Sequence, residues 1–498
     1  MADLLIGLDV GTTATKALLF DIKGQVLAEA SRGYGLLTPR PGWVEQDPEE
    51  IWRAVVETLR SLSARCGPAK RVLALAQSSQ GGTTIPVDAA GLPVHLALSW
   101  MDQRSNDEAA RLQEIWDAES IRALTGWQLV SGLPLLHIAW LRTHRPVEFA
   151  ATSRFLFVND FIGCRLTGLL GMNPSDASIT QLMNLATGDW DEQLLDWAGI
   201  ERGQLSPIRP SAAALGRLTR EAAAATGLSR DMLVINGAHD QYCAAVGTGV
   251  TRPGRMLLSC GTAWVLLAVP EDLTAGLSSG MAISRHAVEG RYGAIRSLGA
   301  VGASLEWLLD QVWRGTGLGE ARDRLYATIN HAVARIPPGS AGALFLPLTG
   351  GHASGFGPAN GGFLNLSINH TRDHMTRAVM EGIACELRWA VEEIRAKGIV
   401  VTELTMVGGA AKSPVWPQIV ADTLDVRVTV PALRDAAARG AAMLAGVGAG
   451  CFQDPEGAFA AWQGGESRLI PDKAARPACE EMYLRYREAA EKQARSHG

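Results

Sequence analysis

Carboxylates, small residues and hydroxyls occur near the start of the chain in an order that suits phosphate chemistry. Asp9 ends an apolar stretch and is followed by the turn Gly11-Thr12-Thr13 and by Lys16. A carboxylate in this place can hold Mg²⁺ or its waters, while turn N–H groups and threonine hydroxyls can donate to phosphate oxygens. An ordinary hairpin with a surface aspartate explains this segment, taken alone, equally well.

A second turn of the same construction, Gly261-Thr262, lies between the apolar stretches 256–259 and 264–269. Taken alone, it is more simply interpreted as a plain β-turn. Two such hairpins, one in each half of the chain, indicate two related domains that face each other. We place their boundary after residue 248, which gives the domains 1–248 and 249–498.

Asp240 is the candidate for proton transfer. It follows the apolar stretch 233–236 and precedes a run of small residues that we expect to be helical. Open α/β sheets bind ligands at the carboxyl ends of their strands, and an aspartate there can accept a proton from an attacking hydroxyl. The competing interpretation is an aspartate that caps the next helix. We expect the neighbouring His239 to be structural.

Two further segments could bind the adenosine of a nucleotide and a sugar. Gly409, followed by Ser413, could receive the adenosine of a nucleotide, because glycine permits close backbone approach and a helix start offers donors. Trp100, Asp102 and Arg104 place an aromatic ring, a carboxylate and a guanidinium together, as a sugar site could use. A tight turn explains the first segment equally well, and a helix start with a local ion pair competes for the second.

Strands alternate with helices along the chain, which is typical of an α/β fold. We expect strands at 4–9, 17–21, 26–30, 71–76, 84–87, 403–407 and 426–430. We expect helices after the cap Asp47 with Pro48, from Ser413 to Leu424, and from Asp435 to Gly446. The alanines and glycines of the last helix would allow close approach to another backbone or to a flat ligand.

Composition excludes several classes of partner. The 498 residues carry a net charge of −5 without a basic run, so we expect neither nucleic acid nor an anionic membrane as partner. The seven cysteines are scattered and form no CxxC pair, and no apolar run approaches a membrane span. We therefore expect a cytoplasmic protein.

The absence of a P-loop, of a GxGxxG after the first strand and of an HExxH motif weighs against P-loop kinases, dinucleotide enzymes and zinc proteases.

Taken together, the segments resemble the FGGY family of carbohydrate kinases over nearly the whole chain. The motifs that carry the resemblance occur in the family's order: LDVGTTATKALLFD, PGWVEQDPEEIW, SSQGGTT, WMDQR, SDASITQLMNL, GAHDQYCAAVGTG, LSCGTAWVLLAV, GAVGASLEWL, EGIACELRWA and VGGAAKSPVWPQIVADTL. The resemblance implies an α/β protein of two actin-like (ribonuclease H-like) domains with a catalytic cleft between them, which uses ATP and Mg²⁺.

The resemblance also implies roles for single residues. The first phosphate loop would be Gly11, Thr12, Thr13 and Lys16, and the second Gly261 and Thr262. Gly302, Glu306, Gly409 and Ser413 would line the nucleotide site. Asp240 would be the catalytic base, and Asp9 and Asp240 would hold the metal. The sugar would be held by Gln80, Gly81, Trp100, Asp102, Arg104 and Gln241.

The chain departs from the family pattern on the sugar side. Xylulose kinases typically have Met-His at the positions of Gln80 and Gly81, and glycerol kinases have Arg-Glu at 81 and 82. His137 stands where a lysine is usual in the first family signature, and Asn365 replaces the last glycine of the second. The segment 350–354 replaces the GERxP-like segment of pentulose kinases. We therefore expect an intact catalytic core and a divergent sugar-binding part.

The predicted function is ATP-dependent phosphorylation of a hydroxyl on a small open-chain sugar, with a pentulose such as xylulose ranked first. The alternatives are a kinase for another polyol or ketose or for an autoinducer-2-type substrate and, in a different class, an ATP-binding regulator. The Asp240-Gln241 pair and the Trp-x-Asp-x-Arg segment argue against the regulator. The expected partners are the sugar and ATP, and a homodimer is left open.

Overall fold

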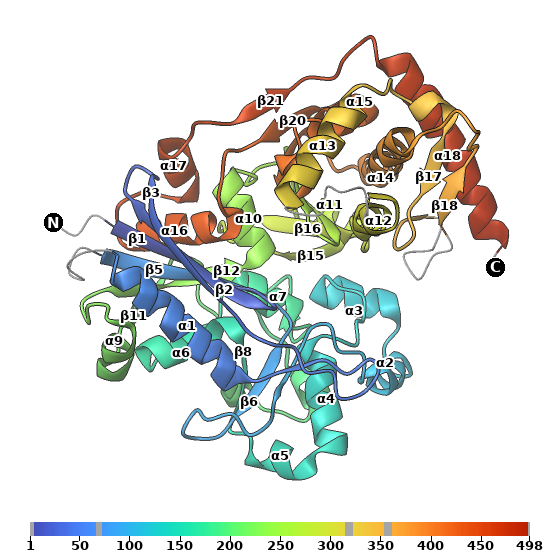
Figure 1. Ribbon diagram of the computed structural model, residues 1–498. Coiled ribbons are helices and arrows are strands. Elements are labelled where there is room, and N and C mark those ends of the chain that lie inside the picture. The colour runs from blue at the N-terminus through green and yellow to red at the C-terminus, as the bar shows by residue number, and fades with distance from the viewer. Residues whose placement is uncertain (1–3, 66–71, 314–321, 353–360, 497–498) are drawn as a thin grey trace. The chain divides into compact units, whose positions relative to one another are not determined.

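The computed structural model describes residues 4–65, 72–313, 322–352 and 361–496 (Figure 1). The chain forms two compact units, each assembled from several segments: the first from Met1–Thr251, Asp272–Gly293 and Leu433–Gln463, the second from Arg252–Glu271, Ala294–Ala432 and Gly464–Gly498. Because each unit takes segments from distant parts of the chain, the boundary after residue 248 stays a prediction. Cys66, Ala353 and Ser354 lie outside the described residues.

A mixed sheet forms the centre of the first unit. Its strands, in hydrogen-bonding order, are β11 (Ala214–Arg217), β12 (Leu233–His239), β5 (Val72–Ser79), β1 (Leu4–Val10), β2 (Ala14–Asp21) and β3 (Val26–Gly33). The strands β12, β5 and β1 run parallel, while β2, β3 and β11 are antiparallel to their neighbours. The carboxyl ends of β1, β5 and β12 therefore meet at one edge of this sheet.

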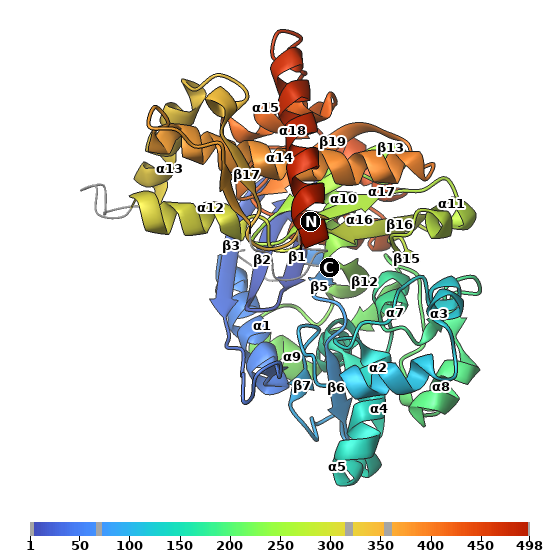
Figure 2. The same cartoon turned by 90° about the vertical axis from the view of Figure 1, so that its right-hand side faces the viewer.

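Helices cover both faces of this sheet (Figures 1 and 2). On one face, the apolar side chains of β1 pack with those of α1 (Pro48–Ser63), α6 (Val158–Thr167) and α9 (Arg220–Thr226) in a continuous buried core. On the other face, α16 (Ala436–Gly448) lies against β1, β5 and β12 and against α10 (Asp240–Thr248). The helix α16 comes from the last fifth of the sequence, yet it covers one face of the sheet whose strand β1 begins at residue 4.

The remaining elements of the first unit are short. Its further helices are α2 (Asn106–Gln113), α3 (Ala118–Thr125), α4 (Pro134–His144), α5 (Pro146–Ala151), α7 (Pro174–Ile179), α8 (Glu192–Ala198), α11 (Leu273–Ser278) and α17 (Pro455–Ala461). Its further strands are β4 (Glu45–Gln46), β6 (Thr84–Val87), β7 (Ala97–Leu98), β8 (Arg154–Phe157), β9 (Met183–Asn184), β10 (Asp189–Trp190) and β15 (Ala282–Arg285).

The sheet of the second unit repeats the order of the first. It contains β16 (Tyr292–Ser297), β14 (Trp264–Ala268), β13 (Gly254–Cys260), β19 (Val401–Gly408), β20 (Arg427–Val430) and β21 (Ser467–Leu469). As in the first unit, an antiparallel hairpin, β13 with β14, continues into parallel strands, β19 and β20. The helices of this unit are α12 (Ala303–Leu308), α13 (Arg322–Ala334), α14 (Arg372–Ala396), α15 (Trp416–Leu424) and α18 (Arg476–Ser496).

A small hairpin of the second unit accounts for one departure from the family signature. The strands β17 (Leu344–Leu346) and β18 (Gly362–Leu364) pair, and Asn365 follows directly with φ +57°. This left-handed backbone conformation favours glycine, and asparagine is among the residues that tolerate it best. Asn365 thus preserves the backbone conformation that the glycine of the signature would permit.

Most of the elements expected from the sequence are confirmed, including both hairpins and the helix capped by Asp47. One helix boundary was wrong. We expected Ser413 to cap this helix with Pro414 as its first residue, but α15 begins at Trp416. The Ser413 hydroxyl still accepts hydrogen bonds from the backbone N–H groups of Val415 and Trp416, just before and at the start of α15. In the described parts of the chain, no helix is both long and apolar enough to cross a bilayer.

Candidate active site

The turn between β1 and β2 presents the first predicted phosphate loop. The backbone N–H of Gly11 donates to the carbonyl of Ala14 at 3.0 Å, which closes the turn. The hydroxyl of Tyr34 donates to the carbonyl of Gly11, and the backbone N–H of Tyr34 donates to Thr13. Thr13 is exposed, and Thr12 is partly exposed. Tyr34, which directly follows β3, thus fixes the turn from one side, while the Thr13 side chain stays exposed.

Asp9 lies in a concentration of negative charge at the end of β1. Its Oδ1 accepts a hydrogen bond of 2.7 Å from the Ser78 hydroxyl. Burial and the charges of Asp435 and Asp240 raise the pKa of Asp9 to about 8, although Ser78 and Lys16 act in the opposite direction. Asp435, the cap of α16, lies with Oδ2 2.7 Å from the Nζ of Lys16. Lys16 therefore interacts with Asp435 and Asp9, while the charge of Asp240 also acts on Asp9.

The surroundings of Asp9 suit a hard divalent cation on electrostatic grounds. Burial is the main cause of its raised pKa, and a bound cation would relieve the added repulsion from Asp435 and Asp240. Mg²⁺ is commonly held by one or two carboxylates together with water and substrate phosphates. Within the described ranges, no group of three or more His, Cys, Asp or Glu side chains is arranged as a metal site by itself. The assignment of Mg²⁺ to Asp9 and Asp240 therefore stays a prediction.

Asp240 is the first residue of α10 and follows the last residue of β12. The strand β12 pairs with the end of β5, where Ala238 lies opposite Ser78. Asp9 and Asp240 therefore lie at the same edge of the sheet, close enough for the charge of Asp240 to raise the pKa of Asp9. One third of the Asp240 side chain (33%) is exposed, so its carboxylate is accessible to a hydroxyl.

Two of the residues predicted to hold the sugar are joined to the phosphate loop. The indole N–H of Trp100 donates to the Thr12 hydroxyl at 3.0 Å, and 45% of Trp100 is exposed. The buried amide of Gln80 donates to Oε1 of Gln46 at 3.0 Å, and Gln46 donates to the carbonyl of Thr12 at 2.7 Å. Gln241 follows Asp240 on α10 and is partly exposed.

Asp102 and Arg104 form an internal ion pair. Nη2 of Arg104 lies 2.8 Å from Oδ2 of Asp102, its Nη1 lies 2.8 Å from Glu45, and both side chains are buried. The guanidinium also lies 3.8 Å from the centre of the Trp43 ring, and Asp102 accepts a hydrogen bond from the backbone of Val44. This is the local ion pair that competed with the sugar interpretation, and a direct role of either residue in sugar binding stays a prediction.

The second unit gathers most of the residues predicted for the nucleotide around the end of β13. Gly261 and Thr262 form the exposed turn between β13 and β14. A Cβ on Gly302 would lie 2.3 Å from the carbonyl oxygen of Gly261, and the backbone N–H of Gly409 donates to Cys260 at 2.8 Å. Three turns are thus packed backbone to backbone at the end of β13.

The two other nucleotide candidates have partners on α13. The Ser413 hydroxyl donates to Oδ1 of Asn330 at 2.6 Å, and Glu306 accepts a hydrogen bond from the Tyr326 hydroxyl. Both side chains thus fix α13 beside the turns at the end of β13. Their contact with a nucleotide stays a prediction.

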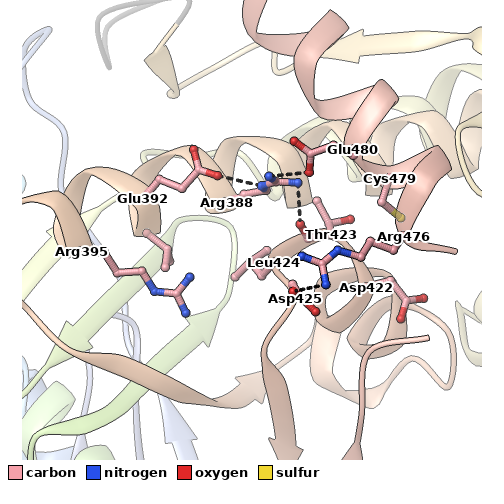
Figure 3. A pocket seen from close by; sticks show the side chains of 11 residues that line it. Arg388, Glu392, Arg395, Asp422, Thr423, Leu424, Asp425, Arg476, Cys479 and Glu480 are labelled. Carbon is pink, nitrogen blue, oxygen red and sulfur yellow. Dashed lines mark hydrogen bonds and ion pairs between the residues drawn. The ribbon is translucent and has the colours of Figure 1, made fainter. Parts of the chain in front are cut away.

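The second unit also has a cavity of about 190 Å³, away from these turns (Figure 3). It is lined by side chains of α14, α15 and α18 and by the ends of these helices. Its arginines already have partners: Arg388 lies 2.7 Å from Glu480, and Arg476 lies 3.0 Å from Asp425. Acidic side chains offset the arginines, so this cavity offers no excess positive charge to a phosphate group.

Sequence reasoning predicted no role for Gln46, Ser78 or Asp435, although each contacts a predicted site residue. Gln46 lies in a motif that carried the family resemblance, and Asp435 was expected only as the first residue of a small-residue helix. A buried polar residue within a family motif is the signal that could have pointed to Gln46. Nothing in the local sequence around Asp435 indicates that its partner, Lys16, lies 419 residues away.

Comparison with known families decides what kind of protein carries this site. The model of the FGGY carbohydrate kinase N-terminal domain matches residues 4–247, and that of the C-terminal domain matches residues 256–449. The chain belongs to the FGGY family of carbohydrate kinases. Each of the two units contains the α/β sheet expected from the family resemblance, and the predicted fold class is confirmed.

Similar FGGY kinases carry different substrate names. The chain is 30% identical to a gluconokinase of Bacillus subtilis, covering 89% of this chain and 87% of that one. It is 33% identical to a glycerol kinase of Gloeobacter violaceus, over 94% and 93% of the two chains. A crystal structure of xylulose kinase from Rhodospirillum rubrum superposes with a TM-score of 0.87 at 29% identity, covering 98% of each chain. The chain is therefore a sugar kinase whose substrate these relatives do not settle.

Proposed function

We propose that this FGGY kinase transfers the γ-phosphoryl group of ATP to a hydroxyl of a small open-chain sugar, with a pentulose such as xylulose as the first candidate. The observation that carries the proposal is the position of Asp240. Its partly exposed carboxylate lies at the same sheet edge as the Gly11–Thr13 turn, Asp9 and Lys16. The proposed proton acceptor and the proposed phosphate-binding turn thus lie at one edge of the same sheet.

In the proposed reaction, Asp240 accepts the proton of the acceptor hydroxyl as its oxygen forms a bond to the γ-phosphorus. The bond between the γ-phosphorus and the bridging oxygen of ADP breaks, and ADP leaves with that electron pair. Lys16 supplies positive charge near the turn, and the N–H groups of the turn hold phosphate oxygens. Trp100 and Gln80 orient the acceptor while bonded, directly or through Gln46, to Thr12.

Mg²⁺, when bound beside Asp9 and Asp240, would offset the charge of the β- and γ-phosphates. The negative charges of Asp435 and Asp240 close to Asp9 support this assignment. In the second unit, Gly261, Thr262, Gly302 and Gly409 would hold the remainder of the nucleotide by their backbones, with Glu306 and Ser413 nearby.

The second candidate is a kinase for another polyol, ketose, autoinducer-2-type substrate or sugar acid. The residue at position 81 supports this second candidate, because Gly81 offers no side chain to the acceptor. The gluconokinase and glycerol kinase relatives, at identities close to that of the xylulose kinase, also support an open panel of substrates.

An ADP-release assay with a panel of acceptors tests the proposal. We expect ATP with one open-chain sugar, polyol or sugar acid to give turnover well above the sugar-free rate, and xylulose is the first acceptor to try. The Asp240→Asn variant should lower kcat at least about a hundredfold, the low end for loss of an acid–base group, while ATP still binds.

Two results would contradict the proposal. An ADP release that no acceptor in the panel increases would favour the ATP-binding regulator. Near-normal turnover by Asp240→Asn would remove Asp240 from its role even if the chain is a kinase. Binding of ATP to the variant, measured by calorimetry, excludes misfolding as the cause of lost turnover.

A further inference from the structure

Gly81 and His239 compete for one space beside Asp240. A Cβ added to Gly81 would lie 2.5 Å from Cδ2 and 2.9 Å from Nε2 of the His239 imidazole, and 3.0 Å from a methyl group of Ile179. Real Cβ atoms essentially never come within 3.0 Å of such neighbours. The imidazole therefore occupies the place where a side chain of residue 81 would begin, so any side chain at that position would require the ring to move.

The imidazole of His239 is held on several sides. Its residue is 8% exposed and ends β12, and its backbone N–H donates to the Ser175 hydroxyl at 3.0 Å. Its ring lies 5.8 Å from that of Tyr242, whose hydroxyl donates to the carbonyl of Gly293 at 3.0 Å. Tyr242 also packs edge-on against the ring of His286. The anchored backbone and the neighbouring Tyr242 ring thus limit how far the imidazole can move away from Gly81.

The fixed ring points one edge at the predicted catalytic base. Nε2 of His239 lies 3.3 Å from Oδ1 of Asp240. The same Nε2–Cδ2 edge faces Gly81, a position predicted to contact the sugar. The other ring nitrogen, Nδ1, is buried and has no hydrogen-bond partner among the residues that the structure describes. An acceptor hydroxyl at Asp240 would therefore approach next to the Nε2 edge.

We propose that His239, whose imidazole fills the space left by the missing side chain of Gly81, is a positioning and specificity-determining residue of this kinase. The imidazole edge fixes the Asp240 carboxylate and forms the wall against which the carbon next to the reacting hydroxyl packs. The acceptor class is then an open-chain molecule with an oxygen on that adjacent carbon, within hydrogen-bond reach of Nε2. This inference rests on the proposed role of Asp240.

A double-substitution cycle tests the steric part without any substrate. Gly81→Ala alone should lower the urea midpoint, because overpacking a buried site is destabilising. Gly81→Ala made in a His239→Ala background should cost much less, because the ring that the Cβ would meet is gone. Gly35→Ala is the control for replacing a glycine, since a Cβ there meets nothing within 4 Å. Equal costs of Gly81→Ala in both backgrounds would overturn the matched pair.

The functional part is tested with the acceptor that the wild type phosphorylates. His239→Ala should lower kcat/KM for this acceptor at least about tenfold and leave KM for ATP within about twofold. His239→Gln, which can place an amide near the Nε2 position, should recover part of the loss. An analogue lacking the oxygen on the adjacent carbon should lose less with His239→Ala than the full acceptor does.

The outcomes separate this inference from the proposed function. A wild type without acceptor-dependent turnover contradicts the proposed function, while the urea midpoints still decide whether Gly81 and His239 share one space. A wild-type kinase in which His239→Ala changes the kcat/KM of acceptor and analogue equally, or raises only KM for ATP, overturns the specificity role. Failure of His239→Gln to recover any activity overturns the role of the Nε2 edge.

Discussion

Thr12 is the residue at which the predicted phosphate and sugar groups meet. Its hydroxyl accepts a hydrogen bond from Trp100, and its carbonyl accepts one from Gln46, which in turn accepts one from Gln80. Gln46 is fully buried and uses both ends of its amide. A movement of Trp100 or Gln80 on sugar binding would therefore be transmitted directly to the phosphate turn.

We expect Gln46→Leu to lower kcat/KM for ATP about tenfold. The substitution leaves the buried Gln80 amide without its partner, at a cost of about 1–3 kcal/mol, and removes the bond to the Thr12 carbonyl, which is only partly buried. Gln46→Glu is the comparison variant: its carboxylate still accepts from Gln80, but its other oxygen cannot donate to the Thr12 carbonyl, and burying its charge adds a desolvation cost. Steady-state kinetics with ATP varied at saturating sugar make the measurement. A Gln46→Leu enzyme with unchanged kinetics for both substrates would show that this relay has no function.

The sequence predicted the residues with local motifs and missed those whose partners lie far along the chain. Asp9, Thr12 and Lys16 share one hairpin, so their proximity follows from strand pairing. Gln46 lies 34 residues from Thr12, and Asp435 lies 419 residues from Lys16. Contacts of this kind depend on how elements pack, and hydrophobic patterns do not encode them.

At the scale of elements, glycines allow α16 to pack closely against α10 and β1. A Cβ on Gly440 would lie 1.8 Å from the carbonyl oxygen of Cys243 on α10, and one on Gly247 would lie 2.2 Å from that of Ala436. A Cβ on Gly7 of β1 would lie 1.7 Å from the carbonyl oxygen of Ala438. The sequence left open whether this small-residue helix approaches a backbone or a flat ligand, and the contacts show close approach to two backbones.

We expect Gly440→Ala to destabilise the protein by about 2–3 kcal/mol, the upper part of the range for overpacking. The sign is informative, because alanine in the interior of an unconstrained helix stabilises by about 1 kcal/mol relative to glycine. Chemical denaturation measures the change. Gly203→Ala is the control, since a Cβ at that position meets nothing within 4 Å, and it should change stability little. A stabilised Gly440→Ala protein would refute the close approach of α16 to α10.

At the scale of the molecule, the two sheets share one strand order. In each, a three-stranded antiparallel group, β1 to β3 or β13 with β14 and β16, continues into parallel strands. Two similar hairpins in the sequence were enough to predict two related domains. They could not indicate that residues 433–463 belong to the first unit, because that assignment rests on the packing of α16 and not on a local motif.

Buried ionisable groups couple the stability of the whole chain to pH with opposing signs. Burial lowers the pKa of His137 to about 3 and of His286 to about 4, so each favours the unfolded state as pH falls below about 6.5. Burial raises the pKa of Asp160 to about 7, so that folded Asp160 takes up a proton in the same range and acts in the opposite direction. The total dependence on pH therefore cannot be assigned to one group, and a difference between variants is needed.

His137 offers that difference. It is fully buried on α4, its Nδ1 lies 3.0 Å from the Thr84 hydroxyl, and Asp102 and Arg104 act on its pKa in opposite directions. A folded pKa of about 3 against about 6.5 unfolded predicts a loss of about 2 kcal/mol between pH 7 and pH 5 from this group alone. His137→Asn keeps a polar group near Thr84 and cannot titrate, so its stability relative to the wild type should improve by that amount over this range.

Urea midpoints at pH 7, 6 and 5 measure this difference for His137→Asn, and the exposed His331→Gln serves as the control. The control should follow the wild type at each pH, because the His331 side chain is exposed to solvent in the folded protein. A wild type and a His137→Asn protein that lose stability in parallel would mean that His137 is charged in the folded state. The imidazole would then carry the positive charge that a lysine usually supplies at this position in the family. The prediction that burial keeps His137 neutral would be wrong.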